Sequence, residues 1–214
     1  MKLASSSSSV PCLAWLLIIM MMATSALSQS DEVVDTNRRP LQYGVEYYIQ
    51  PAITDSGGRF TLISRNDSSG PPYVGQLNTD IGEGLPVTFL PHAGVGKVVK
   101  VNIDFRVAFS AVSTGAQPTL WKVGANDTKS ERRLIVIGRA LSRLDYGNWF
   151  RIVKTQFGGI YNIRWCPTEV CPKCKFFRCG TIGQLRKNGK ILEALDGNVL
   201  PVEFVRRASS SFAE

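Results

Sequence analysis

The chain has 214 residues, a formal net charge of +8 and a hydrophobic fraction of 44%. A chain of this length suits one domain with a substantial buried core, which excludes a small scaffold that depends on disulfides for folding. It contains one histidine and five cysteines, so few side chains are available for catalysis or for metal binding.

The N-terminal segment has the pattern of a secretory signal peptide. A basic start at Lys2 precedes the apolar run LAWLLIIMMMA at residues 13–23, and residues 26–28 offer a small–x–small cleavage site. The run is too short to span a bilayer, although a buried helix is an alternative. We predict a signal peptide at residues 1–28 and a single domain at residues 29–214. Removal of the signal peptide leaves a net charge of +7, because Lys2 is its only charged residue.

The predicted signal peptide implies passage through the secretory pathway. We therefore expect the protein outside the cell or in a vacuole, and we expect no nucleic-acid partner. Two glycosylation sequons, at Asn66 and Asn126, agree with an exposed surface in a secreted protein. We expect the mature chain to be a monomer.

The mature part of the chain shows strand patterns and almost no helical periodicity. Short runs rich in β-branched and aromatic residues are separated by Gly, Pro, Asn and Asp. Examples in chain order are VEYYI (45–49), LPVTFL (85–90), VKVNIDFRVAF (99–109), RLIVIG (133–138), WFRIVK (149–154), YNIRW (161–165) and LPVEFV (200–205). We predict an all-β fold.

Two sequence echoes divide the predicted strands into repeats. The segments YYIQ, VNIDF and YNIRW align on Ile49, Ile103 and Ile163, while LPVTFL, WFRIVK and LPVEFV form a second echo. Both echoes fit a period of about 57 residues, which indicates three similar units. Three units of four strands each, arranged about a pseudo-threefold axis, would close the sheet and remove its edges. We predict a β-trefoil.

Four cysteines lie together in the segment WCPTEVCPKCKFFRC (165–179), with the spacing C-x4-C-x2-C-x4-C. Loss of the signal peptide would remove Cys12 and leave an even number of cysteines in an oxidising compartment, which favours disulfides. Three pairings are possible, and the symmetric spacing favours one of them. In that pairing two nested disulfides, Cys166–Cys179 and Cys171–Cys174, flank a turn.

Two other interpretations of the four cysteines remain open. Four thiolates at this spacing could bind zinc as a knuckle, although an oxidising compartment disfavours free thiolates. The sequence Cys-Pro-Lys-Cys suggests a redox site, but no βαβ pattern surrounds it. We expect neither a metal nor another cofactor.

The stretch from Val170 to Leu192 is basic. It contains two adjacent phenylalanines, Phe176 and Phe177, and no acidic residue. Its basic residues are Lys173, Lys175, Arg178, Arg186, Lys187 and Lys190. Such a patch could bind a polyanion, such as an acidic polysaccharide or an anionic membrane surface. The alternative is a solvated basic face with the phenylalanines turned toward the core.

The segment VVDTNRRPLQYGVEYYIQPA (33–52) resembles the opening signature of plant Kunitz-type inhibitors, the soybean trypsin inhibitor family. Further blocks resemble the family in the same order: GLPVTFLP (84–91), VNIDF (101–105), PTLWKVG (118–124), GNWFRIVK (147–154), YNIRWCPTEVCPKCKFFRCGTIG (161–183) and LPVEFVRRA (200–208). The paired cysteines resemble the miraculin-like branch. The resemblance implies a secreted or vacuolar β-trefoil of plant defence that binds and inhibits an endopeptidase. It also implies the same nested disulfides.

The sequence departs from the family pattern in its first half. Most members have a further disulfide there, and its two half-cystines align with Gly70 and Gly115. This disulfide is therefore absent, which should lower stability by a few kcal/mol relative to a bridged relative.

The sequence also departs from the family at the expected inhibitory loop. The resemblance places this reactive loop at Leu90, Pro91, His92, Ala93, Gly94, Val95, Gly96 and Lys97. The residue that fills the protease's specificity pocket falls at Ala93, where trypsin-directed relatives have Arg or Lys. The asparagine that braces the loop in the family falls at Tyr43, and a phenol cannot replace an amide's hydrogen bonds. Two glycines add flexibility.

These observations predict a serine protease inhibitor that is not directed against trypsin. Lys97 is an alternative contact for a trypsin pocket, and Leu90 for a chymotrypsin pocket. A different function is also open, in which a miraculin-like defence or binding protein has lost inhibition and binds a polyanion. Catalysis is not expected, because His92 is the only histidine and neither G-x-S-x-G nor H-E-x-x-H occurs.

Overall fold

The computed structural model describes residues 31–65, 70–110, 119–139, 145–173 and 178–208. The predicted signal peptide lies outside these residues. In this part of the chain, no helix is long and apolar enough to cross a membrane. The compact unit that begins at Glu32 contains all of the strands described below.

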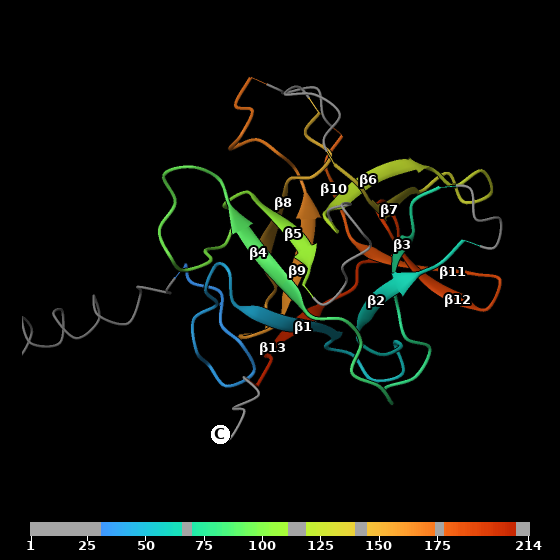
Figure 1. Ribbon diagram of the computed structural model, residues 1–214, viewed down its shortest axis with the longest axis horizontal. Coiled ribbons are helices and arrows are strands. Elements are labelled where there is room, and N and C mark those ends of the chain that lie inside the picture. Colours follow the sequence, from blue (N-terminus) through green and yellow to red (C-terminus); the bar gives the residue numbers. More distant parts are fainter. Residues whose placement is uncertain (1–30, 66–69, 111–118, 140–144, 174–177, 209–214) are drawn as a thin grey trace, which may run out of the picture. The chain divides into compact units, whose positions relative to one another are not determined.

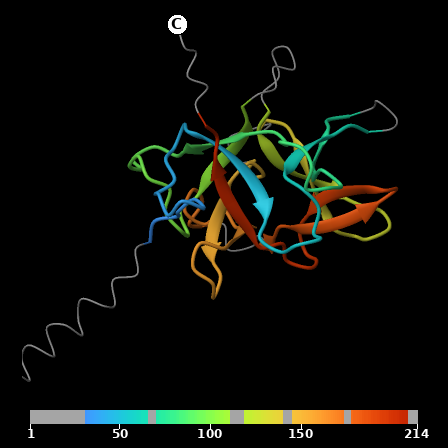
Figure 2. The ribbon, with the colours of Figure 1, turned by 90° about the horizontal axis from the view of Figure 1, so that it is seen from below.

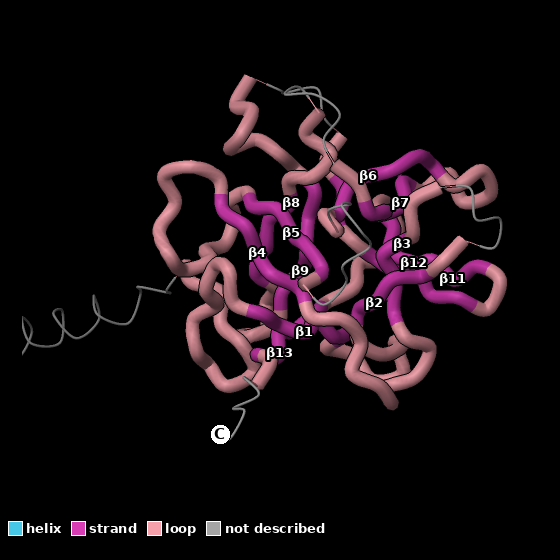
Figure 3. Tube along the Cα trace, in the orientation of Figure 1, coloured by secondary structure: helices cyan, strands magenta, loops and turns pink. Residues whose placement is uncertain are grey.

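The described residues form strands connected by loops and contain no helix (Figure 3). The strands are β1 (Glu46–Pro51), β2 (Phe60–Ile63), β3 (Tyr73–Gln76), β4 (Val87–Pro91), β5 (Phe105–Phe109), β6 (Trp121–Asn126), β7 (Arg133–Ile137), β8 (Phe150–Lys154), β9 (Tyr161–Trp165), β10 (Gly180–Thr181), β11 (Gly183–Lys187), β12 (Lys190–Ala194) and β13 (Val202–Arg206). The prediction of an all-β fold is confirmed.

Six strands form a closed antiparallel barrel. They follow one another in the order β9, β13, β1, β4, β5 and β8, and β8 pairs again with β9 to complete the ring. The first and last strands of the unit, β1 and β13, lie side by side (Figure 2) and pair along five positions. Closure leaves the barrel without a free edge, since every barrel strand has two neighbours.

Three hairpins form a second layer beside the barrel (Figure 1). They are β2–β3, β6–β7 and β11–β12, and one strand of each, namely β3, β7 and β12, pairs with the other two. The barrel and the hairpin triplet together give three similar units of four strands, with the short β10 added to the third. The predicted β-trefoil is confirmed.

The strand pairing within each unit identifies equivalent positions in the repeats. The first and fourth strands of the three units pair at Tyr47 with Val87, at Phe105 with Phe150 and at Tyr161 with Val202. The second echo is therefore correct, because Val87, Phe150 and Val202 occupy its matching positions.

One residue of the first echo is misplaced. Two residues beyond the paired positions lie Ile49, Val107 and Ile163, which are 58 and 56 positions apart and fully buried. The prediction of Ile103 for the second unit is wrong, because Ile103 precedes β5 and is partly exposed. The reason is local: Asn102 has a positive φ of 62°, so the chain turns there.

The core consists of apolar side chains from all three units. Phe89 meets Phe105 and Phe204 edge to face, at centroid distances of 5.1 and 5.6 Å, inside the barrel. Trp121 and Phe60, both fully buried, stack at 5.7 Å and link the β2–β3 and β6–β7 hairpins. Trp121 also contacts Phe109 and Phe150 of the barrel. The chain thus buries a large core of its own, as its length predicts.

The hairpin layer buries the carboxyl group of Glu193. Glu193, in β12, has no exposed surface, and its carboxylate oxygens have no hydrogen-bond partner among the described residues. Burial raises the pKa of Glu193 well above its usual range. The guanidinium of Arg132 lowers this pKa by a smaller amount, but it donates its own hydrogen bonds to the carbonyl oxygens of Ala194 and Leu195, each at 3.0 Å.

Candidate functional site

The candidate loop, residues 90–97, leaves the barrel at the end of β4 (Figure 1, green, at the left). Leu90 and Pro91 still belong to β4 and pair with Arg106 and Phe105 of β5. The residues beyond Pro91 leave the sheet, and the exposed ones are Ala93, Gly94, Gly96 and Lys97. The predicted residues thus form one projecting connection between two barrel strands.

The outer end of the candidate loop is a tight turn. Ala93 and Gly94 form the turn, and Gly94 has a φ of 84°, which is the positive value that glycine adopts at low cost in a type II turn. A Cβ at Gly94 or Gly96 would have no atom within 4 Å. The side chain of Ala93 is therefore the one that the turn presents.

A stack of three side chains holds the start of the candidate loop. His92 Nδ1 lies 3.0 Å from the carbonyl oxygen of Ala93. The His92 ring meets the indole of Trp149 edge to face, with a centroid distance of 6.3 Å and an interplanar angle of 72°. The Arg106 guanidinium lies over the same indole, 5.1 Å from its centroid. We name these residues the His92–Trp149–Arg106 stack.

Backbone hydrogen bonds hold the end of the candidate loop. The Tyr43 amide donates to the carbonyl oxygen of Lys97 at 2.9 Å, and the Val99 amide donates to that of Leu41 at 2.8 Å. The Val33 amide in turn donates to the carbonyl oxygen of Val99 at 2.9 Å. The segment that precedes β1 therefore fixes this end, and the Lys97 carbonyl is already engaged.

Tyr43, which the sequence resemblance assigned to the bracing position, lies beneath the candidate loop. It lines a hollow together with Pro91, Val95, Gly96 and Lys97. Its hydroxyl is buried without a hydrogen-bond partner among the described residues, and burial raises the pKa of Tyr43 to about 12. Tyr43 therefore supports the loop by packing and by its backbone amide, and its side chain donates no hydrogen bond to it.

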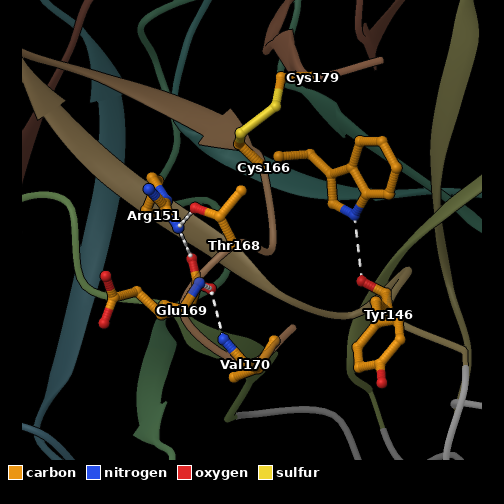
Figure 4. Close-up of polar contacts among 9 residues, drawn as sticks. Tyr146, Arg151, Cys166, Thr168, Glu169, Val170 and Cys179 are labelled. Atoms are coloured by element: carbon orange, nitrogen blue, oxygen red, sulfur yellow. Dashed lines mark hydrogen bonds and ion pairs between the residues drawn. A yellow bond between two sulfur atoms is a disulfide. The ribbon is translucent and has the colours of Figure 1, made fainter. Parts of the chain in front are cut away.

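The connection from β4 to β5 ends at a buried carboxylate, Asp104, that ties it to a second loop. Figure 4 labels the residues that donate hydrogen bonds to this carboxylate, namely Arg151, Glu169 and Val170. Arg151 of β8 donates to Asp104 Oδ1 from Nε at 2.9 Å and from Nη2 at 2.6 Å. The backbone amides of Glu169 and Val170 donate to Asp104 Oδ2 at 2.8 and 3.2 Å. Arg151 Nη2 also donates to Thr168 Oγ1 at 2.8 Å. The Asp104 carboxylate therefore accepts four hydrogen bonds, and the residue is fully buried.

The second loop, residues 166–179, is closed by a disulfide, and we name it the cysteine loop. The predicted pairing of Cys166 with Cys179 is confirmed, with a Cα–Cα distance of 4.7 Å. The zinc knuckle is excluded, since two of the four sulfurs are bonded to each other. Cys171 is also disulfide-bonded, and its predicted partner Cys174 lies outside the described residues.

The predicted basic patch is divided between two parts of the fold. Lys173 and Arg178 lie in the cysteine loop, whereas the other described members lie on the β11–β12 hairpin. Lys187 forms an ion pair with Asp127, which neutralises its charge. Lys190 donates to the carbonyl oxygen of Ser64 at 3.0 Å. The third basic residue of the hairpin, Arg186, is exposed. Lys175, Phe176 and Phe177 lie outside the described residues.

The other predicted positions can be placed only in part. Asn126 is exposed at the end of β6, where a glycan would meet solvent. Asn66 lies outside the described residues, as does Gly115. Gly70 is exposed and has a positive φ of 142°, so its backbone suits glycine.

Two supports of the candidate loop escaped the sequence-based prediction, namely Trp149 and Asp104. Both lie in segments that resemble family blocks, GNWFRIVK and VNIDF, but neither block reveals which loop its residues contact. Asp104 in particular occurs in a strand-like pattern, although its carboxylate is buried and bonded to residues 47 to 66 positions away.

The barrel, the hairpin triplet and the projecting loop together define the architecture of a β-trefoil inhibitor, and the sequence comparisons agree. The family profile described as "Trypsin and protease inhibitor" matches residues 33–206. The chain therefore belongs to the plant Kunitz family of protease inhibitors.

Individual relatives cover most of the chain. A Kunitz type trypsin inhibitor of Medicago truncatula, number 106, is 48% identical over 190 residues, which are 87% of this chain and 91% of the relative. Miraculin of Synsepalum dulcificum is 28% identical over 192 residues, which are 86% of each chain. Among solved structures, a Kunitz-type cysteine protease inhibitor from potato superposes with a TM-score of 0.71 at 27% identity, and covers 84% of this chain and 98% of its own. Two of these three relatives are named as protease inhibitors, one of trypsin and one of cysteine proteases.

Proposed function

We propose that the mature chain inhibits a serine endopeptidase through the candidate loop, residues 90–97. The target would have a small apolar specificity pocket, as elastase does, in place of the acidic pocket of trypsin. The observation that carries the proposal is the exposed Ala93 at the turn of a loop whose two ends are both held.

Specificity follows from the side chain that enters the protease. Trypsin places a carboxylate in its pocket, and a methyl group cannot pair with it, whereas a small pocket accepts alanine. Lys97 is exposed, but its carbonyl accepts a hydrogen bond from the Tyr43 amide. That carbonyl would have to give up this bond before it could enter a protease's oxyanion hole. The loop therefore favours Ala93 over Lys97 as the specificity residue.

Inhibition also requires that the loop be ordered before it binds. An ordered loop loses little conformational entropy on docking, which raises affinity. The His92–Trp149–Arg106 stack orders one end of the loop, and the hydrogen bond from the Tyr43 amide orders the other. The glycines between the two ends increase the flexibility of the backbone. We expect inhibition, but of lower affinity than a fully braced loop would give.

We also propose that residues 1–28 direct the chain into the secretory pathway, to the apoplast or to a vacuole. A structural disulfide such as Cys166–Cys179 forms and persists in an oxidising compartment, which supports this location.

A panel of proteases tests the proposed function. Trypsin, chymotrypsin, elastase, subtilisin and papain, each at a known active-site concentration, are titrated with disulfide-bonded protein of residues 29–214. We expect the tightest inhibition with elastase and weak inhibition with trypsin. Inhibition of papain alone would assign the cysteine class, and a nanomolar complex with trypsin would overturn the role of Ala93.

The alternative function, polyanion binding without inhibition, has less support. The predicted basic patch is divided, and one of its members is neutralised by Asp127. If no protease of the panel is inhibited, salt-dependent retention on a polygalacturonate column would favour this alternative.

A further inference from the structure

The candidate loop lacks the side-chain brace that the family uses. Tyr43 occupies the asparagine position, and its hydroxyl has no hydrogen-bond partner among the described residues. Between His92 and Lys97 the backbone passes through Ala93, Gly94, Val95 and Gly96. Among the described residues, only His92 Nδ1 lies within hydrogen-bonding distance of this backbone, at the Ala93 carbonyl oxygen. A different group must therefore limit the motion of the loop if the loop is to dock in one shape.

Trp149 is the side chain best placed to do so. It contacts His92 edge to face at 6.3 Å, and His92 in turn lies 3.0 Å from the Ala93 carbonyl oxygen. His92 is only half-buried, and its Nε2 is covered without a hydrogen-bond partner among the described residues. The ring is therefore held by packing against the indole. An aromatic pair of this geometry contributes more than its buried area alone.

The backbone that carries Trp149 is itself fixed. The neighbouring Asn148 is buried, and its Nδ2 donates to the carbonyl oxygens of Trp121 at 2.6 Å and Gly138 at 2.7 Å. On the other side Phe150 is fully buried and is the first residue of barrel strand β8. An indole between two anchored residues can transmit the rigidity of the barrel to the loop.

Arg106 completes the support from β5. Its guanidinium lies 5.1 Å from the centroid of the Trp149 indole, and its Nε is buried without a hydrogen-bond partner among the described residues. The orientation of this guanidinium therefore depends on the indole, and the cation–π contact favours a fixed ring. The support of His92 therefore comes from Trp149, directly before β8, and from Arg106 of β5, which packs on the indole.

We propose that Trp149 is the positioning residue of the candidate loop, and that it acts through His92 on the backbone at Ala93. In this chain the indole takes over the bracing role that other members of the family assign to the asparagine aligned with Tyr43. The link to inhibition rests on the proposed function, whereas the effect of Trp149 on loop order does not.

The test compares two variants at one position. Trp149→Phe keeps an aromatic ring for His92 and Arg106, while Trp149→Leu removes it. Tyr73→Leu is the matched control, since Tyr73 also lies under a guanidinium, that of Arg65 at 4.5 Å, but belongs to the hairpin layer. For each protein we measure the heteronuclear NOE of the amides at residues 93–97, the rate of subtilisin cleavage in that segment, and the inhibition constant for the best protease of the panel.

We expect Trp149→Leu to lower the amide NOE values and to raise both the cleavage rate and the inhibition constant about tenfold. Trp149→Phe should restore most of the loop order and of the inhibition, and Tyr73→Leu should change neither. A structural role alone would lower the unfolding temperature without this selective change in the loop and without rescue by phenylalanine.

The outcomes separate the two proposals. Unchanged loop order and cleavage in a folded Trp149→Leu protein would overturn the bracing role, whatever the inhibition data show. A disordered loop in Trp149→Leu, together with no inhibition by the wild type, would leave the brace correct and the proposed function wrong. If Trp149→Leu does not fold, His92→Ala is used in its place. This variant also removes the contact between the loop and the indole, but at a half-buried residue, so it should still fold. A loop that stays ordered in His92→Ala would contradict the proposal.

Discussion

The candidate loop and the cysteine loop are ordered by different means. The cysteine loop is closed covalently by Cys166–Cys179, and its backbone amides donate to the buried Asp104. The candidate loop has no covalent closure, and side-chain packing at His92 and backbone bonds at Lys97 fix it. The difference indicates that a loop need not be cross-linked to be presented in one shape, but that each of its ends must then contact the barrel.

The largest expected effect concerns the carboxylate that connects the two loops. Asp104→Ala removes four hydrogen bonds and leaves Arg151 without its carboxylate partner. Loss of one partner from a buried ion pair costs about 3–5 kcal/mol, and we expect a decrease of this size in the free energy of unfolding. Urea denaturation measures it. A decrease below about 1 kcal/mol would show that the two loops are not connected through this group.

A substitution at the turn should change the protease that the candidate loop recognises. Ala93→Arg supplies the charge that the acidic pocket of trypsin requires, so we expect trypsin affinity to increase about a hundredfold. Adding Tyr43→Asn should increase it further and non-additively, because an amide brace matters once the loop docks. Trypsin titrations of the single and double variants measure both effects. An unchanged trypsin constant in Ala93→Arg would move the specificity residue away from Ala93.

Reduction should affect the cysteine loop more than the barrel. The sequence separation of 13 residues between Cys166 and Cys179 corresponds to about 3 kcal/mol of stabilisation by the disulfide in the chain-entropy model. The core lies in the barrel and the hairpin layer, so the reduced protein should still unfold in one cooperative transition at a lower temperature. Calorimetry with and without reductant measures this. A reduced chain that is unfolded at room temperature would contradict it.

The hairpin layer offers a comparison with both loops, since the buried carboxyl group of Glu193 has no hydrogen-bond partner among the described residues. Its pKa is raised by burial, so the folded state binds a proton more tightly than the unfolded state. Glu193 therefore favours folding at pH values below the unfolded pKa, and this contribution is lost as the pH rises through the folded pKa. We expect the wild type to lose stability between mildly acidic and alkaline pH.

Two substitutions at Glu193 test this pH dependence. Glu193→Gln should flatten the curve of unfolding free energy against pH, because the amide does not titrate. Glu193→Leu should stabilise the protein at neutral pH by about 1–3 kcal/mol, since it removes buried polar atoms that lack partners. Thermal unfolding from pH 4 to pH 9 measures both. An identical pH curve for wild type and Glu193→Gln would exclude Glu193 as the source.

The smallest expected effect concerns the hydroxyl beneath the candidate loop. Tyr43→Phe removes a buried polar atom without a partner among the described residues and keeps the ring that packs under the loop. We expect a gain of about 1 kcal/mol in unfolding free energy and no change in protease inhibition. A loss of stability in this variant would reveal a hydrogen bond at the hydroxyl.

Periodic features of the sequence predicted the fold well. Runs of β-branched and aromatic residues predicted seven of the thirteen described strands, namely the six barrel strands and β7. The echo at Val87, Phe150 and Val202 identified the three units, because equivalent strands bury the same positions. The other echo failed at Ile103. A strand-like pattern continues there through Asn102, but the left-handed backbone at this residue ends the extended conformation.

Features that depend on distant contacts were less predictable. The symmetric cysteine spacing predicted Cys166–Cys179, because a local loop has few ways to close. Alignment with the family placed Tyr43 under the candidate loop, which the structure reproduces. The roles of Trp149 and Asp104 depend on partners that are at least 43 and at least 47 positions away in the sequence, and no local pattern encodes such contacts.

The threefold arrangement of the barrel also bears on how such a protein can diversify. The connection from β8 to β9, residues 155–160, joins the second unit to the third, just as residues 92–104 join the first to the second. Residues 155–160 form the shorter connection and residues 92–104 the longer one, yet each joins the fourth strand of one unit to the first strand of the next. Because the entropic cost of a longer connection grows slowly with its length, insertions at these junctions need not disturb the barrel. The fold can therefore acquire a new recognition surface at one junction while its core sequence stays the same.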